Sequence, residues 1–329
     1  MSKAHADGLL FGVYPGGAAG DDSGGLAVGP PDDPAEISAA LDLLQGRPGR
    51  PFLVRAYIAF DDGTAVSTRH ATAAPVDAAR YAERGRTLDL VAQYRSASGN
   101  VDGYCRFVRQ LVEQFGAITS TLQVAEEPDV TDNPMLDGYY PNVVQAIVRG
   151  VSAGKARARE LGFDHLRVGF NSTPLFGPAA SFPATLTEYG GVEFVRDLDY
   201  VGLDFFPDVF RPVPDTELAD AVAGLLRHHR AAVLAPAGLD HPPLHITEHG
   251  WPTGPDRTPR RQAEVVDIVV RIVAAEAEAL RLSGYTHFAL RDADSANPDL
   301  FHQLGLMTDG YIPKPAFETL RALVDKHSA

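Results

Sequence analysis

The chain has 329 residues, of which 45% are hydrophobic and 22% charged, and this balance excludes a disordered, collagen-like or membrane-embedded protein. Its 43 acidic and 29 basic residues give a formal net charge of −14. Because this charge repels phosphate backbones and anionic lipids, we expect neither nucleic acid nor membrane partners.

Apolar segments of strand length alternate with amphipathic segments of helix length along the whole chain. The eight predicted strands comprise residues 9–14, 52–59, 87–94, 120–126, 166–171, 200–206, 244–248 and 286–290. The eight predicted helices comprise residues 34–44, 76–84, 101–115, 141–161, 185–197, 216–232, 260–282 and 315–327. In the seventh helix, steps of three and four residues separate the members of one apolar stripe, which are Val265, Ile268, Val269, Ile272 and Val273.

The predicted strands are apolar on both faces, as in 200–206, which is typical of parallel strands covered by helices. Eight strand–helix units predict a single (β/α)8 barrel, a TIM barrel, that occupies residues 1–329 as one domain. An open, doubly wound sheet is the alternative architecture. Long Gly- and Pro-rich segments at 15–31, 172–184 and 291–313 follow predicted strands, and such loops form the rim where barrel enzymes carry their active sites.

The single cysteine, Cys105, permits no intramolecular disulfide, and the first ten residues contain no apolar segment typical of a secretion signal. No segment approaches the ~20 apolar residues that a membrane helix needs. We therefore expect a cytoplasmic protein.

Two glutamates each end an apolar strand just before a chain-breaking residue. Glu127 precedes Pro128 at the end of the fourth predicted strand, and Glu248 lies in the segment 244–252 at the end of the seventh. Opposed carboxyl groups across a barrel mouth suit the cleavage of a glycosidic bond, in which one group is protonated and the other ionised.

These segments resemble the clan A glycoside hydrolases, which are retaining enzymes built on this barrel. Glu127 matches the acid/base of their Asn-Glu-Pro motif, and Glu248 matches their nucleophile in a Thr-Glu-x-Gly-Trp segment. Arg55 matches the arginine that orients the nucleophile, and 304–317 resembles a stretch that precedes the last helix of the clan. The resemblance implies hydrolysis of β-glycosidic bonds in a carbohydrate substrate, without a metal or an organic cofactor.

Two positions depart from the pattern of the clan. Glu126 stands where the clan has asparagine, and Phe288 is the nearest aromatic residue to the missing tryptophan of the eighth strand. By the resemblance and by their places near strand ends, the expected substrate-binding residues are Arg55, Tyr57, Glu126, Asn171, Trp251 and Phe288.

Two other functions remain open. The departures at Glu126 and Phe288 suit a carbohydrate-binding barrel that has lost catalysis. A lyase or aldolase is less consistent with the sequence. Such enzymes usually need a lysine or a metal cluster at strand ends, and none of the lysines lies at a predicted strand end. A zinc site at His245 and His249 is disfavoured, because four residues of extended strand separate these side chains by ~13 Å.

Overall fold

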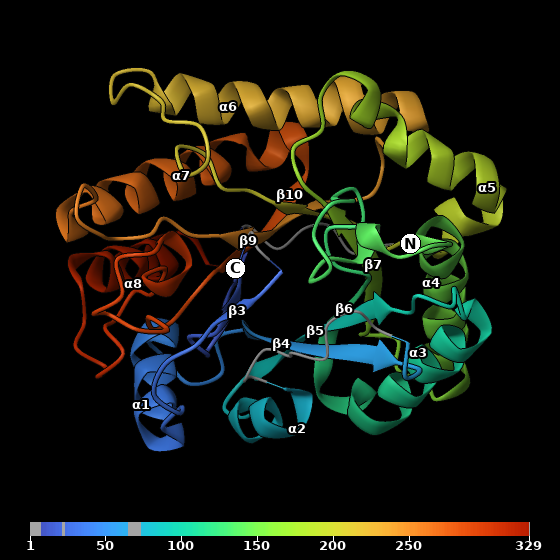
Figure 1. The fold of residues 1–329 in the computed structure, drawn as a ribbon, viewed down its shortest axis with the longest axis horizontal. Helices are drawn as coiled ribbons and strands as arrows, with labels where there is room; N and C mark the ends of the chain where they lie inside the picture. The colour runs from blue at the N-terminus through green and yellow to red at the C-terminus, as the bar shows by residue number, and fades with distance from the viewer. Residues whose placement is uncertain (1–7, 22–23, 65–73, 329) are drawn as a thin grey trace.

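The computed structural model describes residues 8–21, 24–64 and 74–328, which form a closed barrel of parallel strands inside a ring of helices (Figure 1). The barrel order is β1-β10-β9-β8-β7-β6-β5-β4, and β1 closes it by pairing with both β10 and β4. The barrel strands are β1 (Leu10–Val13), β4 (Phe52–Asp61), β5 (Arg86–Arg95), β6 (Thr119–Val124), β7 (Arg167–Ser172), β8 (Tyr200–Asp204), β9 (Leu244–His249) and β10 (Leu282–His287). The predicted TIM barrel is therefore confirmed, and the open sheet is wrong.

The helices pack their apolar faces on the outside of the barrel. They are α1 (Pro34–Gln45), α2 (Pro75–Ala78), α3 (Val101–Phe115), α4 (Val143–Glu160), α5 (Phe182–Asp197), α6 (Leu218–His228), α7 (Pro259–Leu280) and α8 (Pro315–His327). None of the helices in these described ranges combines the length and the apolar character needed to cross a membrane.

Helix α7 shows how local sequence sets an element. Pro259 occupies its first turn, and the side chain of Thr258 caps it by accepting a hydrogen bond from the backbone N–H of Arg261. Of the predicted stripe, Val265, Val269 and Val273 are fully buried, whereas the two isoleucines are half-buried. The buried face is completed by Val266 and Val270, so its centre is rotated by about 60°, roughly a sixth of a turn, from the predicted stripe.

Two predicted elements differ from the structure. The helix predicted at 76–84 is short, because α2 ends at Ala78 and continues as a 3₁₀ turn that buries Tyr81. The last strand lies at Leu282–His287 rather than 286–290, because it begins directly after Arg281, the left-handed residue that ends α7. The apolar residues 288–290 continue beyond the barrel into its rim, where the backbone N–H of Leu290 bonds to the carbonyl of Tyr14.

The first and last loops of the rim touch. The loop after β1 carries a small antiparallel pair, β2 (Ala19–Gly20) and β3 (Leu26–Ala27). At Gly29, a Cβ atom would lie 1.7 Å from the carbonyl oxygen of Ala293, so only glycine permits this close approach. The long loops after the first and the eighth strand therefore form one continuous part of the rim.

Candidate active site

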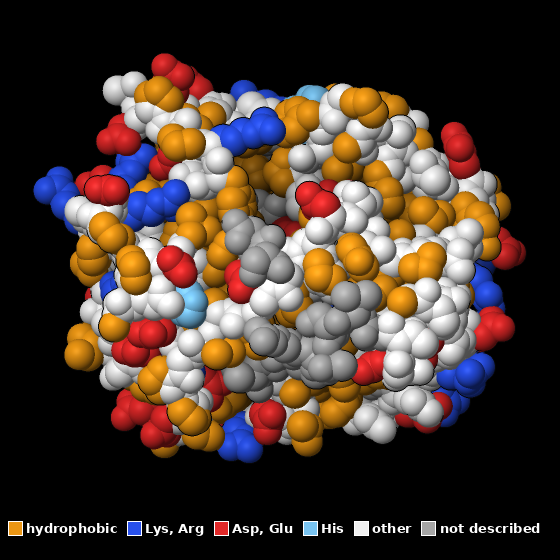
Figure 2. All heavy atoms as spheres, viewed as in Figure 1, with side chains coloured by type: hydrophobic (Ala, Val, Ile, Leu, Met, Phe, Trp, Pro, Cys, Tyr) orange, Lys and Arg blue, Asp and Glu red, His pale blue; other side chains and the backbone are white. Residues whose placement is uncertain are grey.

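A cavity of about 990 Å³ opens at the carboxyl ends of the barrel strands. Figure 2 shows the corresponding face of the molecule, which is hollowed beneath α6. The acidic residues in the cavity wall are Asp21, Glu126, Glu127, Asp204, Asp208 and Glu248. The cavity thus lies on the rim that the long loops predicted, and it contains both glutamates expected to be catalytic.

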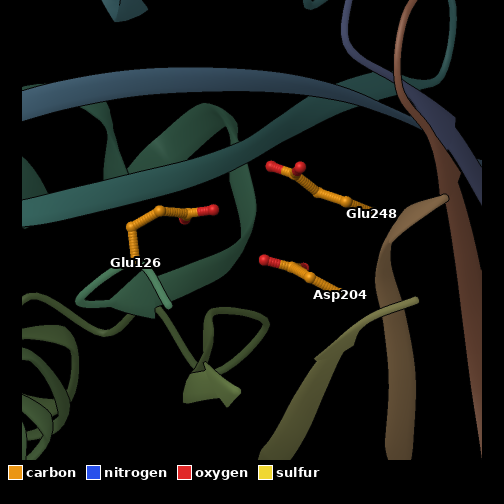
Figure 3. Close-up of side chains that lie close together, drawn as sticks. All are labelled: Glu126, Asp204 and Glu248. Atoms are coloured by element: carbon orange, nitrogen blue, oxygen red, sulfur yellow. The ribbon is translucent and has the colours of Figure 1, made fainter. Parts of the chain in front are cut away.

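Three buried carboxyl groups converge in this cavity. Glu126 lies two residues beyond β6, Asp204 ends β8, and Glu248 lies on β9. One carboxylate oxygen of each lies within 4.8 Å of one from each of the others. Figure 3 shows the three side chains pointing toward one another from these three places in the barrel.

A single buried guanidinium group faces these carboxylates. Arg55 on β4 is 0% exposed. Its Nη1 lies 2.9 Å from Asp89, its Nη2 lies 3.1 Å from Gln123 and 3.4 Å from Glu126, and its Nε lies 3.2 Å from Glu248 Oε1. Burial alone would lower the pKa of Arg55, but the neighbouring Tyr57 and carboxylates raise that pKa well above its usual value. Arg55 is therefore a permanent cation that orients groups from several strands.

Tyr57 adds a second donor to Glu248. It lies two residues after Arg55 on the same strand, so both side chains point to the same side of the sheet. Its hydroxyl accepts a hydrogen bond from Arg55 Nε at 2.5 Å and donates a short one to Glu248 Oε1. Burial raises the pKa of Tyr57 well above its usual value, so the phenol stays protonated and remains a donor. One oxygen of Glu248 is thus held by two donors.

The turn after β6 presents two consecutive glutamates to the cavity. Adjacent residues of a strand face opposite sides, but Ala125 and Glu127 have positive φ angles of 69° and 41°. The backbone N–H of Glu127 donates to Asn171 Oδ1 at 3.0 Å, which fixes this turn against β7. Within the described part of the chain, no side chain hydrogen-bonds the carboxyl group of Glu127, which leaves it available to the cavity.

The crowding of acids shifts their protonation. Burial and the nearby Asp204 and Glu248 raise the pKa of Glu127 well above its usual value. The same causes raise the pKa of Glu126, although Arg55 opposes them. Burial and Glu248 also raise the pKa of Asp204. Several carboxyl groups cannot all ionise easily beside one guanidinium, and their mutual repulsion is one reason why these pKa values rise together.

Asp204 was not predicted as a site residue. Its carboxylate accepts hydrogen bonds from Asn171 Nδ2 at 2.5 Å and from Thr247 Oγ1 at 2.7 Å. Asn171 therefore connects Asp204 to the backbone of Glu127. The sequence feature that could have indicated Asp204 is a single carboxylate inside the apolar segment 200–206. Asp89 inside the segment 87–94 shows the same feature.

Asp137 was also missed, and no sequence pattern marks it. Its side chain accepts hydrogen bonds from the backbone N–H groups of Tyr94 and Glu126, both at 2.7 Å. Burial raises its pKa to about 7, although these bonds and Arg95 oppose the shift. Asp137 thus fixes the backbone that carries the glutamate pair.

The remaining predicted residues lie in different parts of the wall. Phe288 lines the cavity and stacks on Tyr14, with ring centroids 4.7 Å apart. Trp251 is buried; its indole N–H bonds to Asp208 at 3.2 Å, and the Arg257 guanidinium lies 5.3 Å from its ring centroid. Arg55, Asn171 and Trp251 are not among the described residues that line the cavity, so they act on it through the residues they contact.

Glu126, Asp204 and Glu248 also offer the oxygen ligands that hard divalent cations prefer. Arg55, however, already supplies a positive charge at 3.4 Å from Glu126 and 3.2 Å from Glu248. The guanidinium thus compensates charge at Glu126 and Glu248, whereas Asp204 has no ion-pair partner among the described residues.

The barrel resembles solved glycoside hydrolases at low sequence identity. A GH5_18 protein from Streptomyces cattleya, crystallised with GlcNAc, has a TM-score of 0.60 and 15% identity over 98% of this chain and 80% of its own. A glucosidase from Croceicoccus marinus has a TM-score of 0.67 and 13% identity over 98% of this chain and 68% of its own. A family 17 β-1,3-glucanosyltransferase from Rhizomucor miehei has a TM-score of 0.58 and 15% identity over 93% of this chain and 96% of its own.

No protein-family model and no curated protein sequence matches the chain. At such low identity, the structural similarities show a shared fold. The chain therefore shares the (β/α)8 barrel fold of these glycoside hydrolases.

Proposed function

We propose that this chain is a retaining glycoside hydrolase that cleaves β-glycosidic bonds, with Glu248 as the nucleophile and Glu127 as the acid/base. The observation that carries this proposal is the pairing of Arg55 and Tyr57 with one oxygen of Glu248. Glu127, whose pKa is raised, lines the same cavity and is free to donate its proton. An oriented nucleophile and a protonated acid in one cavity are the two requirements of this chemistry.

The reaction has two steps. A carboxylate oxygen of Glu248 attacks the anomeric carbon, the glycosidic C–O bond breaks, and the proton of Glu127 passes to the leaving oxygen. Water then attacks the anomeric carbon, the bond to Glu248 breaks, and Glu127 takes up a proton from the water. The two displacements consume one water molecule and retain the configuration at the anomeric carbon.

The other residues have supporting roles in this proposal. Tyr57, Glu126 and Phe288 line the cavity beside Glu248 and contact the sugar. Asn171 is a positioning residue, since it holds the backbone of Glu127. Trp251 is also a positioning residue, because it anchors Asp208 in the cavity wall.

The test uses a panel of aryl β-glycosides, on which aryl release is followed for the wild type and four variants. We expect Glu248→Gln to lose at least about a thousandfold in kcat/KM, because the covalent path is removed. Glu127→Ala should lose much less on substrates whose leaving group needs no protonation, and azide should rescue it with retention. The exposed Glu188 of α5 supplies a matched control, and Glu188→Gln should behave like the wild type.

Two outcomes would contradict the proposal at different points. Azide rescue of Glu126→Ala instead of Glu127→Ala would transfer the acid/base role to Glu126. Calorimetric binding of oligosaccharides without any turnover by the wild type would instead identify a carbohydrate-binding barrel.

A further inference from the structure

The cavity has two walls of different character. Around the barrel from Glu127 to Glu248, the shorter path passes β7 and β8, and the longer path passes β5, β4, β1 and β10. The longer path contributes polar groups, including Gln93 and Arg95 of β5, together with apolar ones such as Leu26, Phe288 and Leu304. The shorter path and the elements above it contribute mainly apolar side chains, which are Pro174, Phe176, Phe205, Phe206, Val209, Phe210, Val213 and Leu225, and the last loop adds Leu300 and Phe301.

Aromatic rings connect this apolar wall. Phe206 and Phe210 lie 6.2 Å apart between ring centroids, and Phe210 lies 6.2 Å from Phe301 of the last loop. Phe210 is 63% exposed and Phe176 is 47% exposed, although both line the cavity. Large apolar side chains exposed around a concave site are typical of a surface that binds an apolar ligand.

The polar groups on this wall offer little to a second sugar. Asp208 already accepts from Trp251 and pairs with Arg261 at 3.4 Å. His228 stacks on Phe176 and bonds to the carbonyl of Leu175 at 3.2 Å, and Arg211 is exposed at the outer edge. Because buried hydroxyl groups without partners are costly, a sugar placed here would lose hydrogen bonds that it makes in water.

The wall lies on the side from which a leaving group departs. Glu127 protonates the leaving oxygen in the proposed reaction, so the leaving group lies next to Glu127. The backbone of Glu127 is bonded to Asn171 on β7, and Asp129 accepts a hydrogen bond from the N–H of Thr173 in the loop after β7 at 3.0 Å. The loop after β7 therefore lies directly beside Glu127, and the loop after β8 is its neighbour around the barrel.

We propose that this apolar wall binds the leaving group, and that the substrates are glycosides of apolar, planar aglycones rather than oligosaccharides. The inference rests on the proposed hydrolase function, which it extends to a substrate class. A volume of about 990 Å³ is large enough for a sugar with a drug-sized aglycone. The sugar lies on the side of Phe288, Gln93 and Arg95, and the aglycone lies against Phe206, Phe210 and Phe301.

The test compares phenyl and 4-biphenylyl glycosides of the sugar that the wild type hydrolyses best, together with the matching disaccharide. These two aryl leaving groups have similar acidity, so the comparison reports binding rather than leaving ability. We expect kcat/KM to be about ten times higher for the biphenylyl glycoside than for the phenyl glycoside. The reason is that burial of the additional ring against the apolar wall stabilises the bound transition state. Phe210→Ala should lower this ratio toward one.

The matched control is Tyr189→Ala. Tyr189 is an aromatic residue of α5 that is 52% exposed and lies outside the described cavity lining, so its loss should leave the ratio unchanged. Thermal melting of both variants shows whether the fold is kept. A disaccharide preferred over the biphenylyl glycoside, with a ratio unaffected by Phe210→Ala, would overturn the inference.

Calorimetry with 4-phenylphenol separates this inference from the proposed function. We expect 4-phenylphenol to bind the wild type and Glu248→Gln alike, and to bind Phe210→Ala about tenfold more weakly. Binding to a protein that hydrolyses no glycoside would support the apolar site and refute the hydrolase. Hydrolysis without 4-phenylphenol binding would support the hydrolase and refute the apolar aglycone.

Discussion

Replacing Arg55 with methionine tests how far the carboxylates of the site depend on one buried cation. The methionine fills a similar space but removes the charge that faces Asp89, Glu126 and Glu248. At ~3 Å and an effective dielectric constant of ~20, each such pair interacts by about 5 kcal/mol. The substitution also removes the unfavourable free energy of burying the guanidinium. The net loss of stability is therefore smaller than the sum of the lost attractions.

Measured losses of one partner from a buried pair give a net destabilisation of about 3–5 kcal/mol. We expect this value for Arg55→Met at pH 7. On acidification the orphaned carboxyl groups take up protons, so the difference from the wild type should shrink between about pH 7 and pH 4.5. The variant therefore has a larger defect at high pH than at low pH.

The assay is urea unfolding of the wild type and Arg55→Met at both pH values. Arg109→Met is the matched control, because Arg109 is 35% exposed in its side chain and pairs with the 48% exposed Glu160. Its loss should cost less than about 1 kcal/mol. A cost for Arg55→Met as small as that of the control, or one that does not change with pH, would refute the reasoning.

Two further variants test other parts of the site, and a third tests a buried ion pair outside the cavity lining. Tyr57→Phe removes the hydroxyl that donates to Glu248, so kcat/KM on aryl glycosides should fall roughly tenfold to a hundredfold, and an unchanged rate would contradict the assigned role. Asp137 has a folded-state pKa of about 7 against 3.8 for the free side chain, so the folded state binds the extra proton, and wild-type stability should fall as pH rises from about 4 to 7. Urea unfolding across this pH range should show that the free energy of unfolding falls less steeply with pH for Asp137→Asn than for the wild type. Equal slopes for the two proteins would show that Asp137 does not take up the extra proton. Lys314→Met leaves Asp292, its partner at 2.7 Å, as an unpaired buried acid, so unfolding experiments should show a loss of about 3 kcal/mol, and a loss below 1 kcal/mol would argue against this pairing.

The barrel was predictable from the sequence because its signals are local. Each strand is a short apolar segment, and each helix repeats its apolar residues at a helical period, so the alternation of units indicates a parallel sheet and their number, eight, favours a closed barrel. The ends of elements were less predictable. The segment 288–290 is as apolar as a strand, yet it forms the rim, because the pairing of β10 with its neighbours ends at His287.

The site was predictable where a residue type, a strand end and a resemblance coincided, as for Glu248 and Arg55. Asp204 lacked a motif, and its approach to Glu126 depends on the closure of the barrel. Asp137 lies in an irregular segment, so its bond to the backbone of Glu126 depends on a loop path that periodicity does not describe. Trp251 was conspicuous in sequence but faces Asp208, since being next to a candidate nucleophile does not determine which way a side chain points.

The partners of Arg55 also differ in the order in which they are synthesised. Asp89 lies 34 residues after Arg55 in the chain, and Glu248 lies 193 residues after it. At a translation rate of about 5–20 residues per second, Asp89 follows Arg55 within roughly 2–7 s and Glu248 within roughly 10–40 s. Asp89 is therefore available as a partner of Arg55 well before Glu248, which β9 supplies only after most of the barrel strands have been synthesised.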